Sequence, residues 1–179
     1  MDLTSLLHRI QLDLFLNGPQ YKFYIEVAAV AVLLYVGFTD FRTFKIRNDV
    51  LLLLVVLYVP LAIVSPSCSW IEIVESIVLA ILVFAVLLWF FAQKVIGGGD
   101  VKLLSVACLW VGVHGALLFS ALLLIFILLH VGAVRMGWAN TKPMGGRYAI
   151  PYAPSVAGAM IGVIVYSAIV TQGGGMRCL

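Results

Sequence analysis

The chain has 179 residues, of which 64% are hydrophobic and 11% are charged, and its formal net charge is +3. Soluble domains carry about 25% charged residues. This composition, with a mean hydropathy of +1.15, therefore excludes a water-soluble globular protein. We predict an all-α integral membrane protein that lies in a lipid bilayer. The basic residues form no continuous stripe along the sequence, so we expect no nucleic-acid partner.

The first and last segments differ from the rest of the chain. In residues 1–22, leucines and an isoleucine recur at helical spacing, which predicts an amphipathic helix on the membrane surface. A loosely ordered tail is the alternative for this segment. Gly18-Pro19 interrupts the pattern, and we predict a break there. We expect residues 23–171 to form the membrane domain and the glycine-rich residues 172–179 to form a flexible tail.

The membrane domain is predicted to contain about six transmembrane helices. The count depends on residues 103–134, which carry no formal charge. As one helix they would extend about 48 Å, whereas the hydrocarbon core of a bilayer is about 30 Å thick. We therefore predict two segments that turn near Gly112-Val113-His114-Gly115. The six predicted spans are 23–39, 49–64, 71–91, 100–111, 116–134 and 151–170.

The distribution of basic residues predicts the orientation of these spans. If both termini lie outside, the links 40–48, 92–102 and 135–150 face the cytoplasm, and they hold eight of the eleven basic residues. The excess of Lys and Arg in cytoplasmic loops favours this arrangement. It places Asp40 and Asp100 on the same, cytoplasmic face of the membrane.

Asp40 and Asp100 stand where apolar segments end and begin, and ionisable groups at such places suggest a functional site. Two carboxylates held close together do not both ionise readily, so they share a proton and titrate as a unit. The ionised member then takes a proton from water, and the protonated member polarises a carbonyl and protonates the departing amine. We therefore predict that the two acids form one catalytic pair of the aspartic-protease type.

Three glycines precede the second acid, in Gly97-Gly98-Gly99-Asp100-Val101-Lys102. Glycine permits a positive φ and lets another backbone approach closely. A structural interpretation remains open, in which the glycines form a simple loop and Asp100 is the N-cap of the next helix. Asp40 would then be an interfacial residue paired with Arg42 or Lys45.

Three patches of the chain resemble those of the type IV prepilin peptidases, which are GxGD-type membrane aspartic proteases. The stretch Gly97-Gly98-Gly99-Asp100-Val101-Lys102-Leu103 resembles their second catalytic motif, a glycine run followed by Asp-x-Lys. The stretch from Asp40 to Asn48 resembles their first, in which an Asp and a basic residue precede Lys-Ile-Pro-Asn. Ile150-Pro151-Tyr152-Ala153-Pro154 resembles a third recurring patch, which opens the last helix. Together the patches cover the three predicted cytoplasmic links.

The resemblance implies that Asp40 and Asp100 are the catalytic acids and that Gly97 and Gly99 shape the site. It implies an endopeptidase of the bacterial inner membrane. Its partner would be a prepilin substrate, from which it removes a short basic leader, commonly after a glycine. Arg47 stands where the family usually has proline. The chain lacks the insert with paired Cys-x-x-Cys motifs of the methylating members, so we expect peptidase activity only, as in the compact subgroup that serves tight-adherence (Flp-type) pili.

Polar residues near the acids are candidates for a supporting role. They can hold one Asp in orientation, or they can serve as anchors for anionic lipid headgroups. Asp49 is a candidate counter-charge for a basic leader, and an N-cap role on the following helix explains Asn48 or Asp49 equally well. The supporting candidates are Arg42, Lys45, Asn48 and Lys102.

The cysteines and histidines are widely separated, with no Cys-x-x-Cys pair and no His at ligand spacing. We interpret the thiols as core-filling side chains and expect neither a metal centre nor a cofactor. These residues are Cys68, Cys108, Cys178, His8, His114 and His130.

Two other function classes compete with a peptidase. A small transporter would use Asp40 and Asp100 to bind a proton or cation at a broken helix, although such charges usually lie near the midplane of the membrane. A non-catalytic scaffold of a secretion apparatus is the third possibility. Substitution of each Asp by Asn distinguishes the three classes. A peptidase would lose its proteolytic activity, whereas a transporter would lose ion flux and show no proteolysis.

Overall fold

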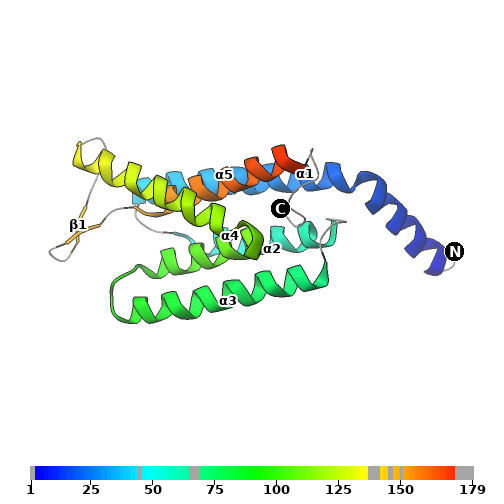
Figure 1. Cartoon of the computed structure of the whole chain (residues 1–179), viewed down its shortest axis with the longest axis horizontal. Coiled ribbons are helices and arrows are strands. Elements are labelled where there is room, and N and C mark those ends of the chain that lie inside the picture. The colour runs from blue at the N-terminus through cyan, green and yellow to red at the C-terminus, as the bar shows by residue number, and fades with distance from the viewer. Residues whose placement is uncertain are drawn as a thin grey trace.

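The structure is a computed structural model that describes the backbone of residues 3–43, 46–64, 69–136, 142–144, 147–149 and 151–171. Side chains are described within 20–43, 46–63, 69–136 and 151–170. Five helices form nearly all of it: α1 (Leu3–Thr43), α2 (Asn48–Val64), α3 (Trp70–Ala92), α4 (Gly98–Arg135) and α5 (Ala153–Thr171). The helices lie roughly side by side along the long axis of the molecule, and α1 extends beyond the bundle at its N-terminal end (Figure 1).

Four stretches of the described helices are long and apolar enough to cross a membrane. The remaining apolar helix, at Asn48–Ile63, is shorter. The helical membrane protein predicted from composition is thereby supported, whereas the count of six spans and the outward position of both termini stay predictions. The four stretches are Gln20–Thr43, Trp70–Ala92, Gly98–Arg135 and Ala153–Val170.

Helix α4 is interrupted at Gly112, whose φ of 62° and ψ of −176° are not helical. A side chain there would be strained, and its Cβ would also lie 2.9 Å from the Ser76 Oγ. After this residue the helix turns back, so that its yellow end lies at the same end of the molecule as its green beginning (Figure 1). The break predicted from the length of residues 103–134 is confirmed, at the first residue of the predicted turn.

Helix α1 continues through Gly18-Pro19, where the sequence pattern predicts a break. That prediction is wrong for the backbone. A helix tolerates an internal proline at the cost of one hydrogen bond and some distortion, and membrane helices tolerate it more readily than soluble ones. Whether residues 1–22 form a separate surface segment stays a prediction.

A short β-hairpin lies between α4 and α5, in a link for which the sequence predicts only a polar connection. Strand β1 (Lys142–Met144) pairs antiparallel with β2 (Arg147–Ala149), with Lys142 opposite Ala149. Two glycines separate the strands in the sequence, a pair typical of two-residue hairpin connections. The hairpin lies at the end of the molecule where α4 ends and α5 begins (Figure 1).

The core lies between α1, α2, α4 and α5. Trp110 of α4 is 2% exposed, and its Nε1–H donates to the Leu54 carbonyl of α2 at 2.9 Å. Met160 of α5 and Leu33 of α1 are fully buried in the same cluster. Helix α3 packs mainly against α4 and exposes most of its apolar side chains, as expected for a helix that faces lipid. The core therefore fixes α1, α4 and α5, which carry the candidate site.

Candidate functional site

Asp40 lies in the last turn of α1, and the residue is 5% exposed. The C-terminal end of a helix carries a partial negative charge, so a carboxylate is unfavourable there unless another group compensates it. The compensating group is the main-chain N–H of Ala153, which donates to the Asp40 Oδ2 at 3.2 Å. Ala153 begins α5, so the partly positive N-terminus of that helix faces the buried acid. The third motif patch thus contacts the first.

Asp100 lies in the first turn of α4 and is partly buried. The N-cap of this helix is Gly97, and Asp100 is the third residue after it. The alternative in which Asp100 is the N-cap is therefore wrong. A Cβ on Gly97 would lie 3.1 Å from the Asp100 Oδ2, which shows that the carboxylate folds back over the start of the helix. Because Gly97 has no side chain, the Asp100 carboxylate can occupy the space beside it.

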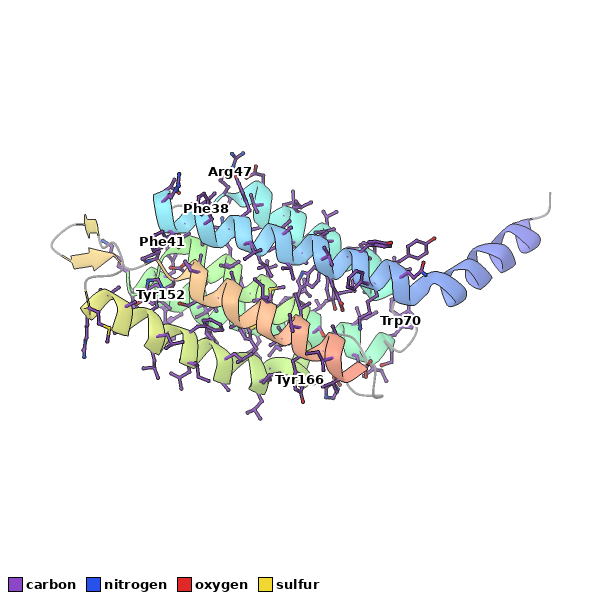
Figure 2. The ribbon with its side chains drawn as sticks, turned by 90° about the horizontal axis from the view of Figure 1, so that it is seen from above. Phe38, Phe41, Arg47, Trp70, Tyr152 and Tyr166 are labelled. Carbon is purple, nitrogen blue, oxygen red and sulfur yellow. The ribbon has the colours of Figure 1, made fainter. Side chains whose placement is uncertain are left out.

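The two acids lie at the same end of the bundle although 60 positions separate them in the sequence. Asp100 follows Gly99, which packs against Ile46, and Ile46 stands six positions after Asp40. Figure 2 shows Phe38, Phe41 and Tyr152 at this end, with Trp70 at the other. The convergence expected from the predicted topology is therefore present in the structure.

Gly99 packs against Ile46, which lies just before α2. A Cβ at Gly99 would meet the Cβ of Ile46 at 3.2 Å, so Ile46 lies directly against the first turn of α4. Among the described residues, the only glycine with positive φ is Gly112. The expectation that glycines 97–99 supply such a conformation is therefore wrong. Their small size matters instead, because the side chains of Ile46 and Asp100 occupy the space a Cβ would need.

The basic residues near the acids contact other groups. The Arg42 guanidinium lies over the Phe38 ring, 4.4 Å from its centroid, and the Lys102 Nζ donates to the Asn48 Oδ1 at 2.9 Å. Within the described side chains, neither cation forms an ion pair with Asp40 or Asp100. Whether they orient an aspartate or anchor lipid headgroups stays a prediction. Lys45 lies outside the described residues.

Asn48 and Lys102 nevertheless have a structural function at the site. Their hydrogen bond joins the start of α2 to the first turns of α4. Asp49 is paired with Arg47, whose Nη2 donates to its Oδ2 at 2.6 Å and whose Nε donates to its Oδ1 at 3.1 Å. This hydrogen-bonded neighbour raises the pKa of the exposed Arg47 guanidinium. Asp49 is therefore already neutralised, which weakens its candidacy as a counter-charge for a basic leader.

His130 belongs to the same end of the molecule, and sequence reasoning missed it. It lies on the half of α4 that follows Gly112, which returns to the end of the bundle where α4 begins (Figure 1). Its Nε2 is buried and has no hydrogen-bond partner among the described residues. No signal in the sequence marks it, because only the reversal at Gly112 brings it back to the acids.

The arrangement suits acid–base chemistry on water. Two carboxylates that sense each other's charge supply one proton acceptor and one proton donor when they share a proton. Within the described part of the chain, no three His, Cys, Asp or Glu side chains gather in a way that would hold a metal ion.

Comparison with known protein families agrees with these features. The model of the type IV leader peptidase family matches residues 27–134, a range that contains both aspartates and the three glycines. Comparison with curated proteins and with solved structures found no match.

Proposed function

Because the chain belongs to the type IV leader peptidase family, we propose that it is an aspartic endopeptidase that removes the short basic leader from type IV prepilins. The observation that carries the proposal is the placement of Asp40 and Asp100 at one end of the helical bundle, where Gly99, the neighbour of Asp100, packs against Ile46, which follows Asp40 in the chain. A peptidase needs a proton acceptor and a proton donor at one peptide bond, and both acids lie within the residues that the family model matches.

In the proposed reaction the pair begins with one shared proton. The ionised carboxylate accepts a proton from water, and the resulting hydroxide attacks the carbonyl carbon of the scissile peptide. The protonated carboxyl donates its proton to the carbonyl oxygen. When the C–N bond breaks, the carboxyl that took a proton from water gives it to the leaving amine. A hydroxyl of the tetrahedral intermediate returns its proton to the other carboxylate, so the pair again holds one proton.

The burial of Asp40 and the partial burial of Asp100 support this chemistry. Burial excludes most competing water and strengthens the electrostatic interactions inside a site. The position at the ends of the helices, rather than at their centres, keeps the acids within reach of a peptide segment outside the bilayer. Glycines 97 and 99 allow the Asp100 carboxyl and Ile46 to take their places beside the first turn of α4.

The topology and location are part of the proposal. We propose six spans with both termini outside, which places the acids at the cytoplasmic face of a bacterial inner membrane. The reversal of α4 at Gly112 and the concentration of basic residues in three links support this orientation. The substrate would be a prepilin of the Flp type, and the reaction would serve pilus biogenesis. No methylation is proposed, because no link between the spans contains a Cys-x-x-Cys pair.

The test is cleavage of a prepilin by the purified protein in detergent, followed by the gel shift that accompanies leader removal. Asp40→Asn and Asp100→Asn are each expected to abolish cleavage and to leave expression intact. Asp49→Asn is the matched control, because this acid is exposed and paired with Arg47 near the same site. Persistent cleavage by either of the first two variants would exclude the aspartate pair as the source of activity. Loss of ion flux without proteolysis would indicate a transporter.

A further inference from the structure

His130 reaches the aspartate pair only because α4 reverses. Thirty positions separate it from Asp100, and a straight helix would place them about 45 Å apart. The break at Gly112 returns the second half of α4 toward the start of the first half. As a result, His130 lies toward the end of the bundle where α4 begins with Asp100 and where α1 ends with Asp40. Three polar side chains from two helices therefore share one end of the bundle.

The Nε2 of His130 is in an unusual position for a nitrogen that can donate or accept a hydrogen bond. It is buried, and no described residue offers it a partner. A buried polar atom without a partner is unfavourable, because it has lost its hydrogen bonds to water. By contrast, two other polar side chains at this end have partners, since Asp40 accepts from Ala153 and Lys102 donates to Asn48. The unpartnered nitrogen points to a group that arrives from outside the chain.

A peptide substrate supplies such a group. Every residue of an extended peptide carries a main-chain hydrogen-bond acceptor, and every residue except proline carries a donor. These groups lose their hydrogen bonds to water when the peptide enters a buried site. The aspartates act on the scissile bond and its water, so another group must satisfy the neighbouring main chain. We propose that His130 is a substrate-binding residue, whose Nε2 hydrogen-bonds to the peptide main chain next to the scissile bond. This inference rests on the proposed peptidase function.

Steady-state cleavage of a synthetic leader peptide by the full-length protein tests the inference. His130→Leu removes the nitrogen and keeps an apolar side chain, whereas His130→Gln places an amide nitrogen near the position of Nε2. Loss of one hydrogen bond of about 1.4 kcal/mol corresponds to about a tenfold loss of affinity. We expect KM to rise about tenfold in His130→Leu with kcat little changed, and His130→Gln to restore most of the wild-type KM. His114→Leu is the matched control, because this exposed histidine lies near the break in α4.

A binding measurement separates recognition from chemistry. Fluorescence anisotropy of a labelled leader peptide gives its Kd for the inactive Asp100→Asn protein and for the same protein with His130→Leu. We expect the second Kd to be about tenfold weaker. Equal Kd values would overturn the inference, as would a loss of kcat at unchanged KM. An equal loss in the Leu and Gln variants, with a lowered unfolding temperature, would show a packing function instead.

The two proposals fail in different ways. If the wild-type protein does not cleave, or if Asp40→Asn and Asp100→Asn still cleave, the proposed peptidase function is wrong. If the aspartate variants are inactive while His130→Leu matches the wild type in KM and Kd, only the function of His130 is wrong.

Discussion

The carboxylate of Asp40 at the end of α1 accepts a hydrogen bond from the main-chain N–H of Ala153 at the start of α5, with 3.2 Å between Oδ2 and N. This contact joins residues 113 positions apart in the sequence. It places a buried acid against the N-terminus of a helix, where a negative charge is favoured. The same contact holds α1 and α5 together at the end of the bundle that carries the aspartate pair.

Ala153→Pro tests the importance of this contact, because proline lacks the N–H but is tolerated in the first turn of a helix. Hydrogen bonds to charged groups contribute about 1.5–3 kcal/mol, and the ring would also displace the Asp40 side chain. We expect the free energy of unfolding to fall by about 2 kcal/mol and cleavage to fall at least tenfold. Thermal unfolding in detergent and leader cleavage measure the two effects. Ala153→Gly keeps the N–H, so a similar loss of activity in that variant would contradict the explanation.

Gly97→Ala tests the position of Asp100. The new Cβ would lie 3.1 Å from the Asp100 Oδ2, so the carboxylate must move by a few tenths of an ångström. Small misplacements of reacting groups cost up to about a hundredfold in rate, and we expect kcat to fall about tenfold with little loss of stability. Gly132→Ala is the control within the same helix, because its Cβ would meet no atom within 4 Å. That substitution should leave cleavage unchanged, and equal effects in the two variants would argue against a local cause.

Gly112→Ala tests the reversal of α4. A backbone with φ of 62° and ψ of −176° is essentially restricted to glycine and costs another residue about 1–3 kcal/mol. The added Cβ would also meet the Ser76 Oγ at 2.9 Å. We expect the unfolding temperature in detergent to fall and cleavage to decrease, because the reversal sets the position of His130. Unchanged stability would show that the chain adopts a different conformation at this point.

Labelling of single cysteines tests the proposed orientation. After replacement of the three native cysteines by serine, a cysteine is introduced at Arg42, in the last turn of α1, or at Val95, between α3 and α4. Both positions are exposed. A membrane-impermeant thiol reagent should label both from the cytoplasmic side only. A cysteine at Trp70, which is 82% exposed at the other end of the bundle, should be labelled from the outside. Labelling of the first two positions from opposite compartments would exclude the common site.

The dependence of cleavage on pH tests the shared proton. At low pH both acids are protonated, so neither accepts a proton from water. At high pH both are ionised, so neither donates a proton to the carbonyl oxygen or to the amine. We therefore expect kcat/KM to follow a bell-shaped curve with two limbs that belong to the pair. A flat profile from acidic to neutral pH, measured with a protein that stays folded throughout, would count against the carboxylate pair.

The features that sequence reasoning predicted correctly depend on properties that are local along the chain. The membrane environment follows from composition, because the apolar segments have no other place to be buried. The break in α4 follows from comparing the length of an uncharged stretch with the thickness of a bilayer. The family follows from motifs around Asp40 and Asp100, which the family match contains.

The incorrect and missing predictions concern contacts between distant segments. The sequence pattern predicts positive φ in glycines 97–99, but the structure uses their small size to seat Asp100 and Ile46. It leaves open whether Arg42 and Lys102 orient an acid or anchor lipid headgroups, and in the structure these cations contact Phe38 and Asn48. The residues that these side chains contact lie on other elements of the fold or on the adjacent turn of the same helix.

By itself, the sequence determined that this chain is a helical membrane protein, that α4 must be interrupted, and that two acids stand at the ends of apolar segments. Hydropathy and helix length are properties of contiguous residues, so these features need no knowledge of packing. Only the tertiary structure decided that Ala153 binds Asp40 and that His130 returns to the same end of the bundle. These contacts depend on the direction in which α4 leaves Gly112 and on the side-by-side packing of α1 and α5, which no single segment encodes.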